Sequence, residues 1–183
     1  MMLVNPVQTY KRAFIMNLFI SDFLGAAAIG LGATLIMDLW ALFSHKYLGL
    51  TPPNYCLVGR WFRYMPDGKW RHYNIAKSQA KWGECAVGWL IHYGIGAVYG
   101  IALVALTSGD WRYHPNIWIA LGFGVATLVF PFLVMQPSFG LGFFSARVAN
   151  PLQARLKSLF AHAAFGGGLY ISANLINVVT AVT

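Results

Sequence analysis

Four long stretches of apolar residues decide what this chain can fold into. They run roughly over residues 19–43, 84–106, 117–135 and 156–179. A helix that crosses a bilayer needs about 20 consecutive, mostly apolar residues. Lipid offers no partners for backbone polar groups, so each stretch is expected to be helical. The sequence therefore predicts an all-α fold, an integral membrane four-helix bundle that forms one domain over residues 1–183.

The composition supports this class and argues against others. Charged residues make up 10% of the chain and hydrophobic residues 58%, whereas a soluble domain carries about 25% charged residues. The net charge of +8 fits basic loops beside a membrane, so the predicted partner is the lipid bilayer and not nucleic acid. Cys56 and Cys85 show no metal-binding or CxxC spacing, and we expect two free thiols.

The basic residues predict the direction of the spans. The loops at 44–83 and 136–155, with their flanks, hold ten Lys or Arg residues, and the other side of the membrane holds three, Lys11, Arg12 and Arg112. Positively charged loops stay in the cytoplasm. We therefore expect these two loops to be cytoplasmic and both termini to lie outside.

Two pairs of spans share a short internal repeat. The first and third spans contain similar Gly, Ala, Thr and Leu patterns at 30–35 and 122–128, and the second and fourth contain HxxxG at 92–96 and 162–166. This indicates two duplicated helical hairpins related by a pseudo-two-fold axis. Chance similarity between spans rich in Gly and Ala is the alternative.

Polar side chains within the spans predict a buried site. Ionisable groups inside a membrane are costly and usually functional. At 1.5 Å per residue, Asp38, His92 and His162 lie about 8, 12 and 9 Å from the cytoplasmic ends of their spans. Glu84 and Gln136 lie near the same end. We expect these groups to meet in the cytoplasmic half of the bundle.

Three uses of this site stay open. His92 and His162 could hold a metal or a haem between them, and one of them alone could hold another tetrapyrrole. The site could instead take a small molecule for transport or for chemistry, with His92 as acid or base. In the third use, the polar groups only join helices, and the chain is a non-catalytic accessory subunit of a larger membrane complex, or a homodimer.

The two cytoplasmic loops supply further candidates. Residues 44–83 are too many for a simple connection, and they interleave arginines with aromatic residues. Such a segment is expected to lie on anionic lipid or to cover the site, with Arg60 or His72 reaching in. In the other loop, Arg147 could hold an anionic group.

The order of several motifs resembles a known family. These motifs are VGRW, GWLIHYGIG, LVMQPSFGLG, SARVANP and ARLKSLFAHAAFGGGLY. Together they are similar, from about Gly30 to Ala173, to small bacterial membrane proteins catalogued as domain of unknown function 2938. The resemblance implies a bacterial inner membrane and supplies no activity, so the question of an enzyme stays open. Positions matching the family pattern are Asp38, Gly59, Arg60, His72, Glu84, His92, Tyr93, Gln136, Pro137, Ser145, Arg147, Asn150, Arg155, Ser158 and His162.

Overall fold

The computed structural model describes residues 6–107 and 109–182, with side chains from residue 21 onward. Its helices are α1 (Pro6–Leu48), α2 (Tyr55–Tyr64), α3 (Glu84–Leu106), α4 (Asp110–Tyr113), α5 (Ile117–Ala126), α6 (Gln136–Ser138) and α7 (Pro151–Val182). Short helical turns η1 (Met65–Asp67), η2 (Ile75–Lys77), η3 (Pro131–Met135) and η4 (Phe143–Ser145) lie between them. The described residues form only helices and their connections, which confirms the all-α prediction.

Four of the described helices are long and apolar enough to cross a membrane. They cover Ser21–Leu48, Glu84–Leu106, Ile117–Ser138 and Pro151–Val182, close to the predicted stretches. The first and last extend further because the helix continues past the apolar residues into polar sequence. The predicted membrane-spanning bundle is thus confirmed by helix length and composition.

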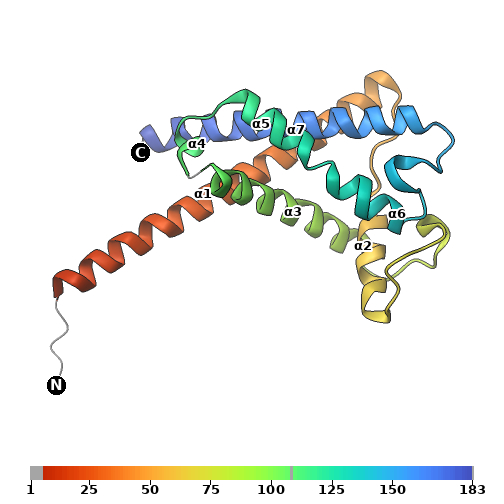
Figure 1. The fold of residues 1–183 in the computed structure, drawn as a ribbon, viewed down its shortest axis with the longest axis horizontal. Coiled ribbons are helices and arrows are strands. Elements are labelled where there is room, and N and C mark those ends of the chain that lie inside the picture. The colour runs from red at the N-terminus through yellow and green to blue at the C-terminus, as the bar shows by residue number, and fades with distance from the viewer. Residues whose placement is uncertain (1–5, 108, 183) are drawn as a thin grey trace.

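The connections gather at the two ends of the bundle (Figure 1). Residues 49–83 and 139–150 lie at one end, which we call the loop face, and α4 and the end of α7 lie at the other, the opposite face. The first part of α1 extends away from the bundle. The side chains of Lys11 and Arg12 belong to this part and lie outside the described residues.

Glycines lie at the contacts between the long helices. α1 packs against both α3 and α7, and α7 packs against both α1 and α5. A Cβ added at Gly30 of α1 would lie 2.0 Å from the carbonyl oxygen of Gly96 in α3. A Cβ at Gly124 of α5 would lie 2.6 Å from the Cα of Gly166 in α7. Glycine thus lets the backbones approach closely, which is the usual basis of helix association in a membrane.

The apolar core fills the half of the bundle towards the opposite face. It contains the buried residues Ala26, Ile29, Ala33, Leu103, Val104, Trp111, Ala120, Phe165, Leu169 and Ala173. At the edge of this core, the rings of Tyr99 and Phe123 lie 6.2 Å apart, and those of Tyr99 and Phe165 lie 6.1 Å apart.

The third span is not one continuous α-helix. α5 ends at Ala126, and the chain passes through a turn into the π-helical segment η3 before α6. Pro131 starts η3, and proline lacks the N–H that an α-helix would use. Such π-helical turns are frequent at functional sites. This irregular turn sets the position of Gln136.

The long loop is folded rather than merely connecting. α2 packs against the start of α3, because glycines again allow close contact. A Cβ at Gly59 would lie 1.8 Å from the carbonyl oxygen of Glu84, and one at Gly88 would lie 1.9 Å from that of Tyr55. Trp61 and Ile75 from this loop form a second small core with Phe139.

Candidate functional site

A cavity of about 670 Å³ lies in the half of the bundle near the loop face. Its walls come from α1, α2, α3, the broken third span and α7, and residues 49–54 form the wall at the loop face. His92, His162 and Gln136 all line it. The residue spacing predicts that these three side chains lie at similar depth. In the structure they line the same cavity.

His92 is held by a carboxylate and a phenol. Its Nε2 lies 3.0 Å from Oδ1 of Asp38, and the Tyr55 hydroxyl donates to the same oxygen over 3.1 Å. The Tyr55 ring stacks on the imidazole with 3.9 Å between centroids. Burial, and then the Asp38 carboxylate, raise the pKa of Tyr55, so its phenol stays protonated as a donor. This arrangement fixes the orientation of the His92 ring.

His162 is held by a threonine. The Thr127 hydroxyl donates to the carbonyl oxygen of Gly124 over 2.6 Å, and His162 Nδ1 lies 2.7 Å from the same hydroxyl. The single hydroxyl proton is already given to the carbonyl, so His162 Nδ1–H is the donor to Thr127. The Nε2 atom of the neutral ring then carries a lone pair.

Gln136 lines the cavity and has a buried polar atom without a hydrogen-bond partner. The residue is 5% exposed, and its Oε1 is buried without a hydrogen bond. Oδ2 of Asp38, behind His92, is in the same state. A buried acceptor without a donor is costly, so a protein retains one where something else supplies the donor.

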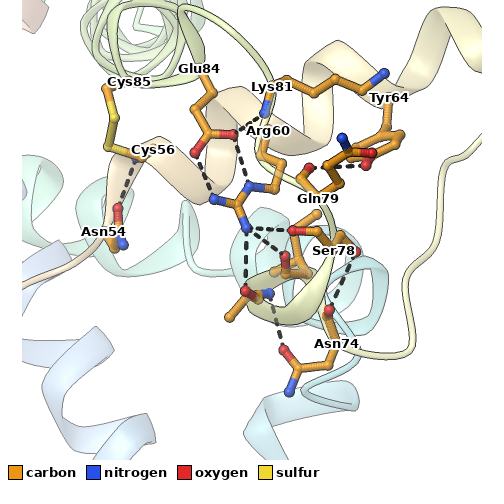
Figure 2. Close-up of polar contacts among 12 residues, drawn as sticks. Asn54, Cys56, Arg60, Tyr64, Asn74, Ser78, Gln79, Lys81, Glu84 and Cys85 are labelled. Carbon is orange, nitrogen blue, oxygen red and sulfur yellow. Dashed lines mark hydrogen bonds and ion pairs between the residues drawn. A yellow bond between two sulfur atoms is a disulfide. The ribbon is translucent and has the colours of Figure 1, made fainter.

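Glu84 does not join the two histidines. Its carboxylate accepts from Arg60, with Nε to Oε2 at 2.8 Å and Nη2 to Oε1 at 2.6 Å (Figure 2). Nη1 of Arg60 donates to the carbonyl oxygens of Ile75, Ala76 and Ser78. Arg60 therefore points away from the cavity and joins α2, η2 and α3. The sequence predicts that Glu84 meets His92, but the packing of α2 on α3 gives Glu84 this other partner.

Two other candidates also lie outside the cavity wall. His72 Nδ1 lies 2.9 Å from Ser78 Oγ, and the His72 backbone N–H donates to the Ser138 carbonyl oxygen over 2.8 Å. Burial, and then Lys69, lower the pKa of His72. Arg147 is exposed. Their proposed contact with a ligand stays a prediction that the geometry does not favour.

A family model matches residues 27–176 of the chain and is described as "Protein of unknown function (DUF2938)". The chain belongs to the DUF2938 family. The matched region contains every cavity-lining residue and the motifs through which the resemblance was found. No curated protein and no solved structure matches the chain.

The DUF2938 chain has a disulfide between Cys56 and Cys85, so the prediction of free thiols is wrong. The bond joins the first turn of α2 to the first turn of α3 (Figure 2). The same close contact that needs Gly59 and Gly88 brings the two sulfur atoms together. Cys56 follows Tyr55 directly, so the bond also anchors the phenol that stacks on His92.

Two residues of the DUF2938 site were not recognised from the sequence. Tyr55 and Thr127 hold the two histidines. From the sequence, Tyr55 lies in the predicted 44–83 loop and Thr127 in the predicted 117–135 span, and neither stretch marks its residue as part of a site. A usable signal for Tyr55 was Asn54, whose side chain caps α2 by accepting from the Cys56 N–H over 3.1 Å. That helix start puts the phenol on the first turn.

The donor set of this DUF2938 chain limits the metal chemistry it can support. No group of three or more His, Cys, Asp or Glu residues among the described positions could hold a metal ion. Each histidine instead has its N–H fixed by a neighbouring acceptor, as is usual for ring nitrogens that bind metals. Two imidazoles suffice only for a metal that brings its other ligands with it, as a tetrapyrrole does.

Proposed function

We propose that this chain binds a small lipid-soluble ligand or cofactor in the cavity near the loop face, in a bacterial inner membrane. The volume of about 670 Å³ falls within the range of small-molecule sites. The walls are mainly apolar with a few polar groups, which is the usual composition of such sites. His92, His162 and Gln136 are the residues proposed to contact the ligand, with Asp38 orienting His92.

The observation that carries this proposal is one cavity lined by two oriented imidazoles and by Gln136, a residue whose Oε1 has no hydrogen-bond partner. A purely structural polar cluster would satisfy its own acceptors. Here, Oε1 of Gln136 and Oδ2 of Asp38 are both left without a hydrogen bond.

A tetrapyrrole with a central metal is one cofactor that fits the donors. His92 and His162 would hold the metal of such a cofactor, and Asp38 and Thr127 would keep the two imidazoles oriented. The alternative of an accessory subunit in a larger complex is tested in the same experiment.

For the orientation, we propose that the loop face is cytoplasmic and both termini lie outside. The ratio of ten basic residues to three supports this through the positive-inside preference. The Cys56–Cys85 bond argues for the reverse, because disulfides are rare in the cytosol. The charge distribution, which draws on thirteen residues, favours a cytoplasmic loop face.

The test is to purify the protein into lipid nanodiscs and identify what stays bound. Absorbance spectra, metal analysis and native mass spectrometry should reveal about one non-phospholipid molecule or pigment per chain. Gln136→Leu and His162→Leu should each lower its occupancy roughly tenfold, which corresponds to about 1.4 kcal/mol. His114→Ala, an exposed histidine at the opposite face, is the matched control and should keep it.

Two outcomes would contradict ligand binding. One is a folded, monodisperse wild type that is empty and takes up nothing from a membrane extract. The other is a chain that stays monodisperse only together with another polypeptide, which would favour the subunit role.

A further inference from the structure

A second cavity lies between the end of α1 and the start of α7, at the loop face. It is a groove of about 710 Å³, which we call the side groove, and it is lined by Trp40, Leu48, Leu50, Asn150, Pro151, Leu152, Gln153, Leu156, Lys157 and Phe160. Most of its apolar side chains are exposed, among them Leu48, Leu152 and Phe160. They belong to two helices long and apolar enough to cross a membrane. In a bilayer, the side groove therefore faces lipid.

The two walls of the side groove reach the same depth. Trp40 precedes Leu48 by eight residues on α1, and Leu152 precedes Phe160 by eight residues on α7, so each wall is about 12 Å long. The rings of Trp40 and Phe160 lie 6.4 Å apart and join the two walls at the deep end. One leaflet has about 15 Å of hydrocarbon. The side groove therefore has the length to hold the upper part of an acyl chain.

Lys157 brings a positive charge into this apolar groove. It is partly buried and lies six residues, or about 9 Å, from the start of α7. Its Nζ donates to the Thr51 carbonyl oxygen over 2.7 Å. An ammonium group has three N–H donors, so two remain for another acceptor. No ion pair between described residues involves Lys157. A charge at this depth is costly and usually has a functional partner.

The polar groups around Lys157 complement an anion. The side-chain amides of Asn150 and Gln153 also line the side groove, and each amide nitrogen is a donor. Gln153 and Lys157 are four residues apart, so they are neighbours on one face of α7. None of the described residues that line the side groove is acidic. Basic pockets between membrane helices are known to bind the headgroups of anionic lipids.

From these features we infer that the side groove binds an anionic phospholipid. The lipid phosphate accepts from Lys157, and one acyl chain lies along the groove towards Trp40 and Phe160. A zwitterionic headgroup brings a cation of its own close to Lys157, so a headgroup with net negative charge binds more tightly. This site is separate from the proposed ligand site, although the two cavities have one wall in common, formed by Trp40, Leu50, Asn150, Gln153 and Lys157.

The experiment compares two lipids that differ only in their headgroup. Full-length protein in detergent micelles, freed of bound lipid, is titrated with equal amounts of phosphatidylglycerol and phosphatidylcholine that carry identical acyl chains. Native mass spectrometry then measures how much of each lipid is present in complexes with one bound lipid. Wild type should retain phosphatidylglycerol in at least about fivefold excess, which is the attraction that one lysine near the membrane surface exerts on anionic lipid.

Variants show whether this preference comes from the side groove. In Lys157→Met the excess should fall below about twofold with phosphatidylcholine binding unchanged, and Lys157→Arg should keep the excess because the charge remains. Lys46→Met is the matched control, because Lys46 is an exposed lysine near the loop-face end of α1 that does not line the groove. Phe160→Ala should weaken binding of both lipids about threefold or more. His162 lines only the other cavity, and His162→Leu should change neither.

Equal retention of the two lipids by wild type, or retention of neither, would overturn the inference. So would an excess that Lys157→Met keeps, or one that Lys46→Met loses to the same extent, because the preference would then come from the basic surface in general. These failures are distinct from failure of the proposed function. A protein that shows no lipid preference but holds a non-phospholipid molecule that depends on His162 leaves the proposed ligand site standing and removes only the lipid site.

Discussion

Arg60 shows how one side chain can organise a loop. Its guanidinium donates to both oxygens of Glu84 and to three backbone carbonyls of residues 75–78. Both partners of the ion pair are largely buried, with 12% and 11% of their side chains exposed. The planar fork of arginine suits this bidentate contact in a way that lysine does not.

Replacing Arg60 with methionine should therefore destabilise the protein strongly. The Glu84 carboxylate would stay buried without its cation, and three carbonyls would lose their donor. Removing one partner of a buried pair costs about 3–5 kcal/mol. The free energy of unfolding, measured by denaturant titration in mixed micelles, should fall by this amount.

The matched control is Lys81→Met, which removes an exposed ion pair with Asp67 at 2.8 Å. Exposed pairs contribute about 1 kcal/mol or less. If the two variants lose equal stability, Arg60 does not have the central role described.

At the scale of elements, the contact between α1 and α3 depends on glycines, which have no side chain to hold the two backbones apart. A Cβ at Gly100 would lie 2.3 Å from the Ala26 carbonyl oxygen and 2.6 Å from the Gly30 nitrogen. Both of these atoms belong to backbone, so neither can move aside without moving a helix. Gly94 lies on the same helix with nothing within 4 Å of an added Cβ.

This pair of glycines gives a direct comparison. Gly100→Ala should lower the free energy of unfolding by about 1–3 kcal/mol, the usual cost of overpacking. Gly94→Ala should leave stability unchanged or raise it by up to about 1 kcal/mol, because alanine favours a helix. Thermal and denaturant unfolding of both variants checks this, and equal effects would rule out a glycine-dependent contact.

The sequence predicted the long helices and the depth of the two histidines, but not the partner of Glu84. Apolar length predicted the four long helices, and the rise per residue brought His92 and His162 to one depth. The partner of Glu84 was not predictable, because it depends on how α2 docks through Gly59 and Gly88. The amphipathic sequence of the ten-residue helix α2 indicates that it docks, but it does not indicate which helix it docks against.

The cysteines show the same limit. Their separation of 29 residues carries no information about distance in space, and Cys56 and Cys85 come together only through the α2–α3 contact. Pro131 could have predicted the break in the third span. The position of Gln136 could not be predicted in the same way, because it depends on the three-dimensional path of the turn that follows Pro131.

At the scale of the whole molecule, α1 and α7 form the centre, with α3 and α5 on their outer sides. Each sequential hairpin contains its own glycine contact, at Gly30 with Gly96 and at Gly124 with Gly166. The internal duplication stays a prediction, and superposition of the two hairpins with His92 over His162 is its test.

The proposed orientation predicts the activity of a reporter fusion in cells. An alkaline phosphatase fused to the C-terminus should be active, because it would lie outside. An inactive fusion would show the reverse orientation, in which the loop face and its Cys56–Cys85 bond lie on the side of the membrane where disulfides persist.

The position of the apolar core also limits how material can move through this protein. Beyond the rings of Tyr99 and Phe165, the tightly packed residues around Leu103 and Leu169 occupy the bundle towards the opposite face. The packed core therefore closes the cavity towards the opposite face. Net passage of a molecule to that face would require this core to open.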